Sequence, residues 1–565
     1  MTEATTEATT QAMTEATTEA TTQAMTEAMT EATTRATPQA TTRATTEAAT
    51  AREADERRYA RFATGSVGFV GRHGLWSAEQ RAAAEALEET LAGLEFVRVG
   101  FGDPHGLMRS KTLTVEAFRT ALRNGIDMSP GPFVFDTGHA VGVDFFAPGG
   151  GIGVPELTGA GDFLIVPDPL TFKVLPYTEA ATGWVIADEY LRDGTAHPLS
   201  SRAVLRRQCA RAAGRGLKYV VGLEVEWYVT RLTGAERGPG AAARAAATVG
   251  GFGVQGEPPA VEPVDGGYQF NLDTLTDGLM YLVTPLARAL RELGLPLRTV
   301  EHESGPGQLE FTFSPMNGQD AADAMLLFRT VTKQICARLG HHASFMALPR
   351  LERFDPSGWH LHQSLFDTAA DRNVFMEREG TALLSEEGLG YVAGLLEHAA
   401  ETALFCIPTV NGYRRLDERH SLSPDRIVWS AENRGALVRV LGGPGEESTH
   451  VENRIGEPCA NPYLYLAAQL AAGLDGVERG LRPGALAEDP HAPTAAALPR
   501  DLAEAVAAME GSAFARELLG KPLQDCLAQL KRSEVARFGE WLAVAGPAGP
   551  GEITAWEHRE YFGAY

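Results

Sequence analysis

Apolar and polar residues alternate in several short segments of the chain, and this two-residue period predicts strands with one apolar and one polar face. The segment VVGLEVEWYVT places Glu224 and Glu226 on one face and Leu223, Val225 and Trp227 on the other. At a rise of about 3.3 Å per residue, the two carboxylates lie about 7 Å apart. We therefore expect a strand that is apolar behind and acidic in front.

Three more alternating segments carry acids or imidazoles on the polar face. These residues are Gln308, Glu310 and Thr312 in GQLEFTFS, His360, His362 and Ser364 in GWHLHQSLF, and His450, Glu452 and Arg454 in HVENR, with Glu303 in the turn ESGPGQ. Any one such strand is better explained as an antiparallel strand with one solvated face. Four strands of this kind together indicate a shared site.

The remaining pattern predicts an α+β protein with two folded domains. From Phe96 to about Asp193 the chain reads as short strands separated by Gly/Pro turns, which indicates a small β-rich domain over 55–195. A helical stretch follows Ser200, and apolar residues with helical spacing then predict helices over 276–293, 320–339, 386–404 and 461–479. These helices alternate with strands and predict a larger α/β domain over 196–565.

The first 54 residues form a low-complexity tail rich in Thr, Ala and Glu. The unit MTEATTEATTQA occurs twice without change, and residues 1–50 contain no Val, Ile, Leu, Phe, Trp or Tyr. Such a segment has almost nothing to bury against the entropy of ordering. We expect it to be disordered and dispensable for folding.

Charge and composition exclude some classes of function. The 565-residue chain has a formal net charge of −23 and no long Lys/Arg cluster, which argues against nucleic acid as a partner. The longest nearly apolar stretch, 462–474, is shorter than the roughly 18 residues that a membrane span needs. Five scattered cysteines without CxxC spacing suit reduced thiols. We expect a soluble cytoplasmic protein with no membrane partner.

The clustered acids predict a divalent metal site. Five carboxylates in one pocket repel one another unless cations neutralise them, and oxygen-rich ligation with one imidazole suits Mg²⁺ or Mn²⁺. Guanidinium groups suited to phosphate are available in Arg415, Arg434, Arg439 and Arg454. The chain has no GxxxxGK[ST] loop and no GxGxxG between a strand and a helix, so any nucleotide is expected to bind to metals and arginines.

The order of these motifs resembles the glutamine synthetase superfamily. The motifs are ExE, ExGPGQxE, SGxHxHQS, PTVNxYxRL, SAxNRxxxxR and ExRxxxxxANPYL, and the resemblance runs from about Phe96 to the C-terminus. It implies a small β-grasp-like N-terminal domain and a large catalytic α/β domain, whose antiparallel sheet forms a half-barrel that lines the active site. It also implies a ring-type homo-oligomer, a hexamer or dodecamer, with sites shared between subunits.

The resemblance also implies roles for individual residues. It places one metal on Glu226, Glu303 and Glu310 and a second on Glu224, His360 and Glu452, with ATP and two or three Mg²⁺ or Mn²⁺ ions as cofactors. It places His362 and Ser364 at the nucleotide and the catalytic Arg434 and Arg439 at the ATP phosphates. It places Arg415, Arg454, Asp355 and Gln308 at the acid substrate, and Asp136 as a candidate acid that helps bind the amine in the adjacent subunit.

Departures from the family pattern suggest the kind of amine. Where ammonia-using members carry a flap glutamate this chain has Leu422, and where they carry Asn-Gly it has Asp355 and Pro356. We therefore expect an ATP-dependent ligase that forms an amide through an acyl phosphate, γ-glutamyl phosphate by the resemblance, and that prefers an organic amine. The alternatives are a glutamine synthetase that uses ammonia, a divalent-metal hydrolase, and a catalytically silent family member.

Overall fold

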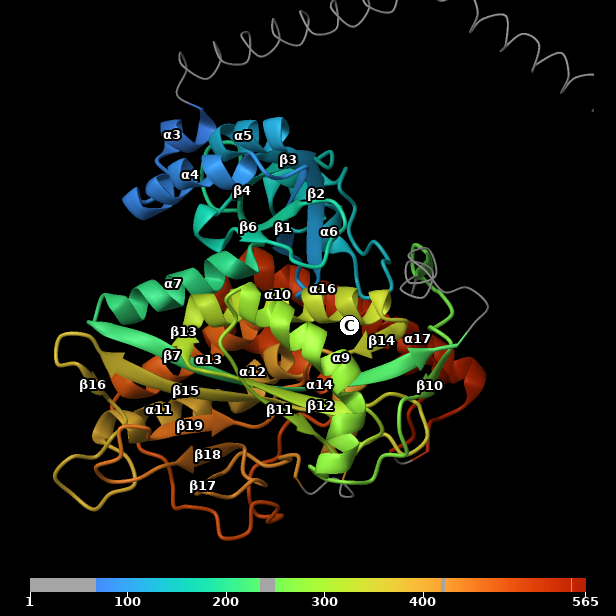
Figure 1. Ribbon diagram of the computed structural model, residues 1–565. Helices are drawn as coiled ribbons and strands as arrows, with labels where there is room; N and C mark the ends of the chain where they lie inside the picture. Colours follow the sequence, from blue (N-terminus) through green and yellow to red (C-terminus); the bar gives the residue numbers. More distant parts are fainter. Residues whose placement is uncertain (1–67, 234–248, 418–421, 550) are drawn as a thin grey trace, which may run out of the picture. The chain divides into compact units, whose positions relative to one another are not determined.

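The computed structural model describes residues 68–233, 249–417, 422–549 and 551–565 (Figure 1). The predicted tail over 1–54 lies outside these residues, as does the beginning of the predicted domain over 55–195. The described chain begins with two helices, forms a small sheet and then a much larger one, and ends in helices. The boundary at 195/196 stays a prediction, although the small sheet uses only strands before it and the large sheet only strands after it.

The small sheet has the strand order β2-β1-β6-β4-β3, with β5 also paired to β6. Only β1 and β6 run parallel in this sheet, and its other pairs are antiparallel. Its strands are β1 Phe96–Gly102, β2 Met108–Thr114, β3 Ile126–Met128, β4 Phe163–Pro167, β5 Lys173–Val174 and β6 Thr182–Tyr190. The first part of the described chain is therefore rich in β-strands, as the pattern of short strands separated by Gly/Pro turns predicts.

Helices also belong to this part of the chain, and the sequence analysis missed them. They are α3 Phe69–His73, α4 Ala78–Leu91, α5 Val115–Asn124 and α6 Gly131–Val134. In α5 the buried residues Val115, Phe118, Ala121 and Leu122 follow helical spacing, so a signal was present. In α4 only Leu91 is buried, because an Ala- and Glu-rich helix has little apolar surface to pack.

The large sheet has the order β11-β12-β7-β15-β19-β18-β17, and it curls as an open half-barrel (Figure 1). Further short strands pair with β7 and β15, and β8 and β9 form a separate pair. Its main strands are β7 Leu217–Leu232, β11 Leu297–His302, β12 Gln308–Phe313, β15 Trp359–Asp367, β17 Trp429–Ala431, β18 Val438–Leu441 and β19 His450–Asn453. The short strands are β8 Val249–Gly251, β9 Val254–Gln255, β10 Val261–Pro263, β13 Met316–Asn317, β14 His341–Ser344 and β16 Arg372–Asn373.

The predicted helices of the second half are present with one correction. The segment 386–404 forms two helices instead of one, because the helical hydrogen bonding is interrupted at His398. This residue is the C-cap of the first helix and the N-cap of the second. The helices are α7 Ser201–Ala213, α9 Asp273–Glu292, α10 Gly318–Arg338, α11 Glu386–Glu397, α12 Ala399–Cys406, α13 Pro462–Glu478, α14 Leu502–Gly511, α15 Ala513–Leu519, α16 Lys521–Ala545 and α17 Ala555–Tyr561. Figure 1 shows α7 and α10 between the two sheets.

Helix α13 contains the longest apolar stretch of the chain and is a core helix. It packs against α11 so closely that a Cβ atom on Gly394 would lie 2.0 Å from the Ala472 carbonyl oxygen, so only glycine fits there. Almost every residue of α13 is buried. Within the described ranges, the model has no helix that combines the length and apolarity needed to cross a bilayer.

Two features of the core fix the strands that carry the polar residues. The buried Gln469 of α13 accepts hydrogen bonds from Gln363 on β15 at 3.1 Å and from Asn453 on β19 at 2.8 Å. Trp227 of β7 and Trp359 of β15 are both fully buried on the apolar face of the sheet. The alternation predicted from the sequence is therefore present, with the apolar face directed into the core.

Candidate active site

Neighbouring strands of the large sheet bring the predicted acids and imidazoles together. In the register of β7 with its neighbours, Glu226 is opposite Glu310 of β12 and Glu224 is opposite His360 of β15. On the next strand, Glu452 of β19 is opposite His362. The polar faces of these strands therefore form one continuous surface, as the sequence analysis predicts.

His360 lies at the centre of this surface. Its Nδ1 atom is 2.6 Å from Glu224 Oε1 and 3.9 Å from Glu452 Oε1, while its Nε2 atom is 3.9 Å from Glu226 Oε1. The donor atoms of Glu224, His360 and Glu452 all lie within 4.8 Å of one another. This triplet is the set that the resemblance assigns to the second metal.

The first predicted metal set is distributed over two triplets. Glu226 and Glu310 group with His360, whereas Glu303 and Glu310 group with Glu301. Glu301 is the acid that the sequence analysis missed. One sequence signal pointed to it, because Glu301 lies two residues before Glu303 and so shares its strand face. Its position opposite Glu310 follows only from the pairing of β11 with β12.

The acids of this cluster differ in how their charge is compensated. Burial, and then the neighbouring Glu303, raise the pKa of Glu226 to about 8, and burial followed by Glu301 raises the pKa of Glu303 to about 7. The pKa of Glu310 is raised by burial and by the surrounding carboxylates. These groups repel one another, and the attraction of Arg415 for Glu226 is too small to cancel the effect.

Glu224 and Glu452 have the opposite behaviour. Burial opposes ionisation of Glu224, but hydrogen bonds with His360 and His362 outweigh it and lower its pKa. Glu452 is fully buried, and His360 and Arg454 outweigh its burial and lower its pKa. Arg439 also donates to Glu452, from Nη1 at 3.2 Å.

Gln308 supports Glu226 from behind. Its side-chain Nε2 lies 3.0 Å from Glu226 Oε2, from the Pro356 carbonyl oxygen and from Ser357 Oγ, and its Oε1 accepts from the Gly305 amide at 3.0 Å. The side chain is buried and its polar atoms are already engaged within the chain. This geometry favours orientation of Glu226 over direct contact with a substrate.

A cavity of about 300 Å³ lies on one side of the cluster. It is lined by Glu226, Glu303, Ser304, Gln308, Asp355, Pro356, Gly358, His360, Arg415, Leu422, Ser423 and Arg454. Arg415 is buried and donates from Nη1 to the Ile455 carbonyl at 3.0 Å, while its Nε has no partner among the described residues. Arg454 pairs with Glu452, and the Asp355 carboxylate accepts from Ser304 Oγ at 2.8 Å.

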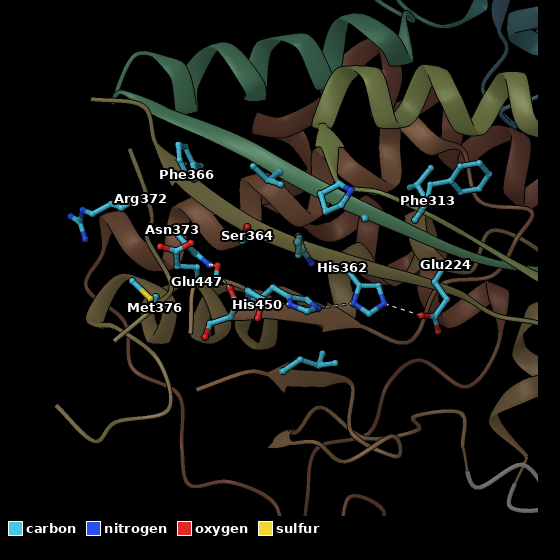
Figure 2. Close-up of a pocket in the computed structure, with 18 of the residues that line it drawn as sticks. Glu224, Phe313, His362, Ser364, Phe366, Arg372, Asn373, Met376, Glu447 and His450 are labelled. Atoms are coloured by element: carbon cyan, nitrogen blue, oxygen red, sulfur yellow. Dashed lines mark hydrogen bonds and ion pairs between the residues drawn. The ribbon is translucent and has the colours of Figure 1, made fainter. Parts of the chain in front are cut away.

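A larger cavity of about 660 Å³ lies on the other side (Figure 2). Its lining includes Glu224, His362, Ser364 and His450, and Figure 2 shows His362 between the other two ionisable side chains, hydrogen-bonded to Glu224 on one side and to His450 on the other. His362 Nε2 is 3.0 Å from Glu224 Oε2. Glu224 and His360 therefore stand in the wall between the two cavities.

Two predicted catalytic arginines lie beside this wall without lining either cavity. Arg439 is held by Glu432 at 2.6 Å and by Glu452. Arg434 is exposed, and its carbonyl oxygen accepts from Arg454 Nε at 2.8 Å. Their roles at phosphate stay predictions.

Asp136 lies apart from the cluster in a separate buried network. Its carboxylate accepts from Arg537 Nε at 2.8 Å, from Ser533 Oγ at 2.7 Å and from the Gly138 and Ala140 amides. The side chain has no exposed surface. These contacts all lie within one chain, and the role of Asp136 in the site of an adjacent subunit stays a prediction.

Comparisons with known proteins agree with this arrangement. A family model described as the catalytic domain of glutamine synthetase matches residues 198–545. The gamma-glutamylanilide synthase of an Acinetobacter species is 39% identical over 501 residues, covering 87% of this chain and 98% of that protein. The glutamine synthetase of Methanosarcina mazei is 30% identical over 474 residues, covering 82% and 95%.

A similar solved structure supports the same relationship. Apo GmaS without ligand superposes with a TM-score of 0.65 at 26% identity, covering 84% of this chain and 98% of that one, and a GmaS complex with ADP gives the same values. The likeness extends over the small sheet as well as the large one, since the covered share exceeds the span of the family model.

Proposed function

The chain belongs to the glutamine synthetase family, and we propose that it joins a carboxylic acid to an organic amine through an acyl phosphate. Family membership makes it an ATP-dependent ligase. The observation that carries the finer proposal is the position of the acid cluster, which forms the wall between a large and a small cavity. ATP in the first and the acid in the second would meet at this wall.

The residues of the wall fit divalent cations. The donor set is five carboxylates and one imidazole, which suits Mg²⁺ or Mn²⁺, and the raised pKa values of Glu226 and Glu303 indicate uncompensated negative charge. Glu224, His360 and Glu452 would hold one ion, and Glu226, Glu303 and Glu310 would hold another. When bound, the ions would neutralise negative charge on the phosphates that react.

The arginines bind and orient the acid in this proposal. Arg415 offers an unpartnered buried Nε beside the small cavity, and Arg454 lies next to it with its guanidinium held by Glu452. A substrate carboxylate bound there attacks the γ-phosphorus of ATP, ADP leaves, and the amine then displaces phosphate from the acyl carbon. Arg439 and Arg434 assist at the phosphates, and His362 and Ser364 contact the nucleotide.

The amine is proposed to be organic because of Leu422. This side chain lines the small cavity with 65% of its surface exposed, so an apolar wall stands where ammonium would need an acceptor. An alkyl or aryl amine gains about 0.8 kcal/mol for each methylene-sized group that it buries. The similarity to a gamma-glutamylanilide synthase supports glutamate as the acid and an aromatic amine such as aniline as the amine.

We also propose a ring-type homo-oligomer. Family likeness supports it, and so do large apolar side chains left exposed on the described chain, such as Phe146 at 82%, Tyr268 at 89% and Phe270 at 69%. Burial of such side chains against another subunit would remove them from water.

The test is ADP release measured over a matrix of acids and amines with ATP and Mg²⁺. The acids are glutamate and other carboxylic acids, and the amines are ammonium, alkyl monoamines, polyamines and aniline. We expect release to require both partners, with kcat/KM for the best amine at least about tenfold above ammonium. A ratio of one or less would indicate a glutamine synthetase, release without an amine would indicate a hydrolase, and no release would indicate a silent member.

A further inference from the structure

His450 is a residue of the large cavity to which the proposed function gives no role. It begins β19 two residues before Glu452, so both side chains lie on the polar face of the sheet. Its Nε2 atom is 2.9 Å from His362 Nδ1, and the ring centroids are 5.1 Å apart (Figure 2). His450, His362 and Glu224 therefore form one chain of side chains along the cavity wall.

The end of this chain fixes which nitrogen atoms carry hydrogen. His450 Nδ1 lies 2.6 Å from the Ser448 carbonyl oxygen, which can only accept, so Nδ1 is the donor. In a neutral ring the His450 Nε2 then has a lone pair and accepts the Nδ1 hydrogen of His362. The His362 ring is thereby held with Nε2 directed at Glu224, 3.0 Å away. Because the Glu224 carboxylate can only accept, Nε2 donates as well, and His362 carries a hydrogen on both ring nitrogens in this arrangement.

We propose that His450 is a positioning residue for His362, whose Nδ1 hydrogen it accepts so that His362 Nε2 is directed at Glu224, in the wall between the two cavities where the proposed function places the nucleotide phosphates. The inference rests on the proposed function for the identity of that ligand. A partner on the second nitrogen of a functional histidine fixes the orientation of the ring. Without the acceptor, the His362 ring can rotate and present the wrong nitrogen.

A second histidine, His341, makes the same local hydrogen bond as His450 without contacting the site, so it supplies a matched control. His341 also bonds through Nδ1 to the carbonyl two residues earlier, Leu339, at 2.9 Å. Its Nε2 atom contacts the Tyr281 hydroxyl at 2.8 Å instead of a residue of the site. What distinguishes His450 is therefore the partner of its Nε2 atom.

Two variants separate the two nitrogens of His450. The amide oxygen of His450→Gln reaches the place of Nε2 and can still accept from His362, whereas the shorter His450→Asn reaches only the place of Nδ1. Binding of a non-hydrolysable ATP analogue with Mg²⁺ is measured by calorimetry on the full chain, without acid or amine. We expect Kd to rise about fivefold in His450→Asn, the loss of one hydrogen bond, and by less than about twofold in His450→Gln and in His341→Asn.

A double-mutant cycle tests whether His450 acts through His362. In a His362→Ala background, His450→Asn should cause no further loss of analogue binding, and KM for the amine should stay unchanged in the single variant. Three outcomes would overturn the positioning role and leave the proposed function intact. They are an equal loss of analogue affinity in His450→Gln and His450→Asn, no loss in either variant, and a full additional loss in the His362→Ala background. A wild-type chain that binds no analogue would overturn both.

Discussion

At the scale of single residues, the site contains two kinds of carboxylate. Glu452 is fully buried yet surrounded by His360, Arg439 and Arg454, which lower its pKa or donate to it. For Glu226, burial and the neighbouring Glu303 outweigh the Gly358 hydrogen bond and the attraction of Arg415, and its pKa is raised to about 8. The compensated acid is built into the protein framework, and the less compensated acid faces the small cavity, where we propose a cation binds.

The first prediction concerns the less compensated acid. Glu226→Gln keeps the shape of the side chain and removes a metal ligand, so we expect kcat/KM to fall at least about 100-fold with little change in melting temperature. Glu292→Gln, at the exposed end of α9, is the control and should retain activity. Activity of the wild type in excess chelator, or full activity of Glu226→Gln, would contradict the metal assignment.

The second prediction concerns pH. The pKa values of Glu226 and Glu303 rise from 4.5 to about 8 and about 7 on folding, so between these limits the folded chain holds more protons than the unfolded chain. The contribution of these two carboxyls to the free energy of unfolding without divalent ions should therefore fall as pH rises from about 4.5 to about 8. Burial lowers the pKa values of His197, His342 and His558, which contribute the opposite slope, so the measurement is the difference in melting temperature between the wild type and Glu226→Gln in chelator. Mg²⁺ should raise the wild-type melting temperature most at the alkaline end.

A control variant makes the pH experiment specific. Glu226→Gln removes one titrating group and should flatten part of the slope, whereas Glu292→Gln should leave the slope unchanged. The same pH slope in Glu226→Gln and in the wild type would show that the Glu226 carboxyl is already compensated.

The third prediction concerns the amine. Leu422→Glu places a carboxylate on the small cavity, so we expect kcat/KM for ammonium to rise and that for the best organic amine to fall, changing their ratio at least about tenfold. Leu486→Glu is the control, because Leu486 is also exposed but does not line this cavity. The same ratio in the wild type and in Leu422→Glu would remove Leu422 from amine selection.

At the scale of elements, α13 holds the strands that carry the ligands. A single buried amide, Gln469, accepts from Gln363 of β15 and from Asn453 of β19. His362 directly precedes Gln363, and Glu452 directly precedes Asn453. One core residue therefore holds two ligand-bearing strands that are also paired through their backbones.

The fourth prediction follows from this amide. Gln469→Leu leaves two buried amides without an acceptor, at about 1–3 kcal/mol each, so we expect a lower melting temperature and weaker binding of Mn²⁺. Gln334→Leu is the control, because Gln334 on α10 also accepts from two side chains, those of Arg98 and Tyr177, away from the site. It should lower stability and leave Mn²⁺ affinity unchanged. Equal Mn²⁺ affinity in both variants would uncouple α13 from the site.

The strands of the site could be predicted from sequence because alternation is a local signal. Glu224, Glu226, Glu310, His360 and Glu452 all lie on the face that the two-residue period assigns to them. Pairing between distant strands is not a local signal. The register that brings Glu301 opposite Glu310 depends on which strands become neighbours, and the analysis therefore missed Glu301.

Helix boundaries and partners of single residues were also harder to predict. The break at His398 arises where its ring bonds both Glu401 and Asp475, one of them on another helix, and apolar spacing does not show such a contact. The partners of Asp136 within the chain, Ser533 and Arg537, come from the other end of the sequence and were likewise not predicted. Both are long-range contacts, which local patterns do not show.

At the scale of the whole molecule, assembly is the remaining prediction. We expect light scattering to give a mass of six or twelve subunits at assay concentration, because exposed aromatic side chains such as Tyr268 and Phe270 favour burial against another copy. Phe270→Ser should weaken the assembly. Phe252→Ser is the control variant, because the Phe252 side chain is similarly exposed but already packs beside Phe135 of the same chain. An active monomer would contradict shared sites.

Side chains alternate between the two faces of the strands that carry the proposed ligands, and this places two tryptophans where their fluorescence can report on the site. Trp227 follows Glu226 and Trp359 precedes His360, and both indoles are fully buried on the opposite face of the same strands. Each indole lies against an aromatic ring, Phe345 at 5.9 Å and Tyr465 at 5.0 Å. A shift of either strand when an ion binds in front would change the surroundings of an indole behind, so intrinsic fluorescence can follow occupancy of the site in the unlabelled enzyme.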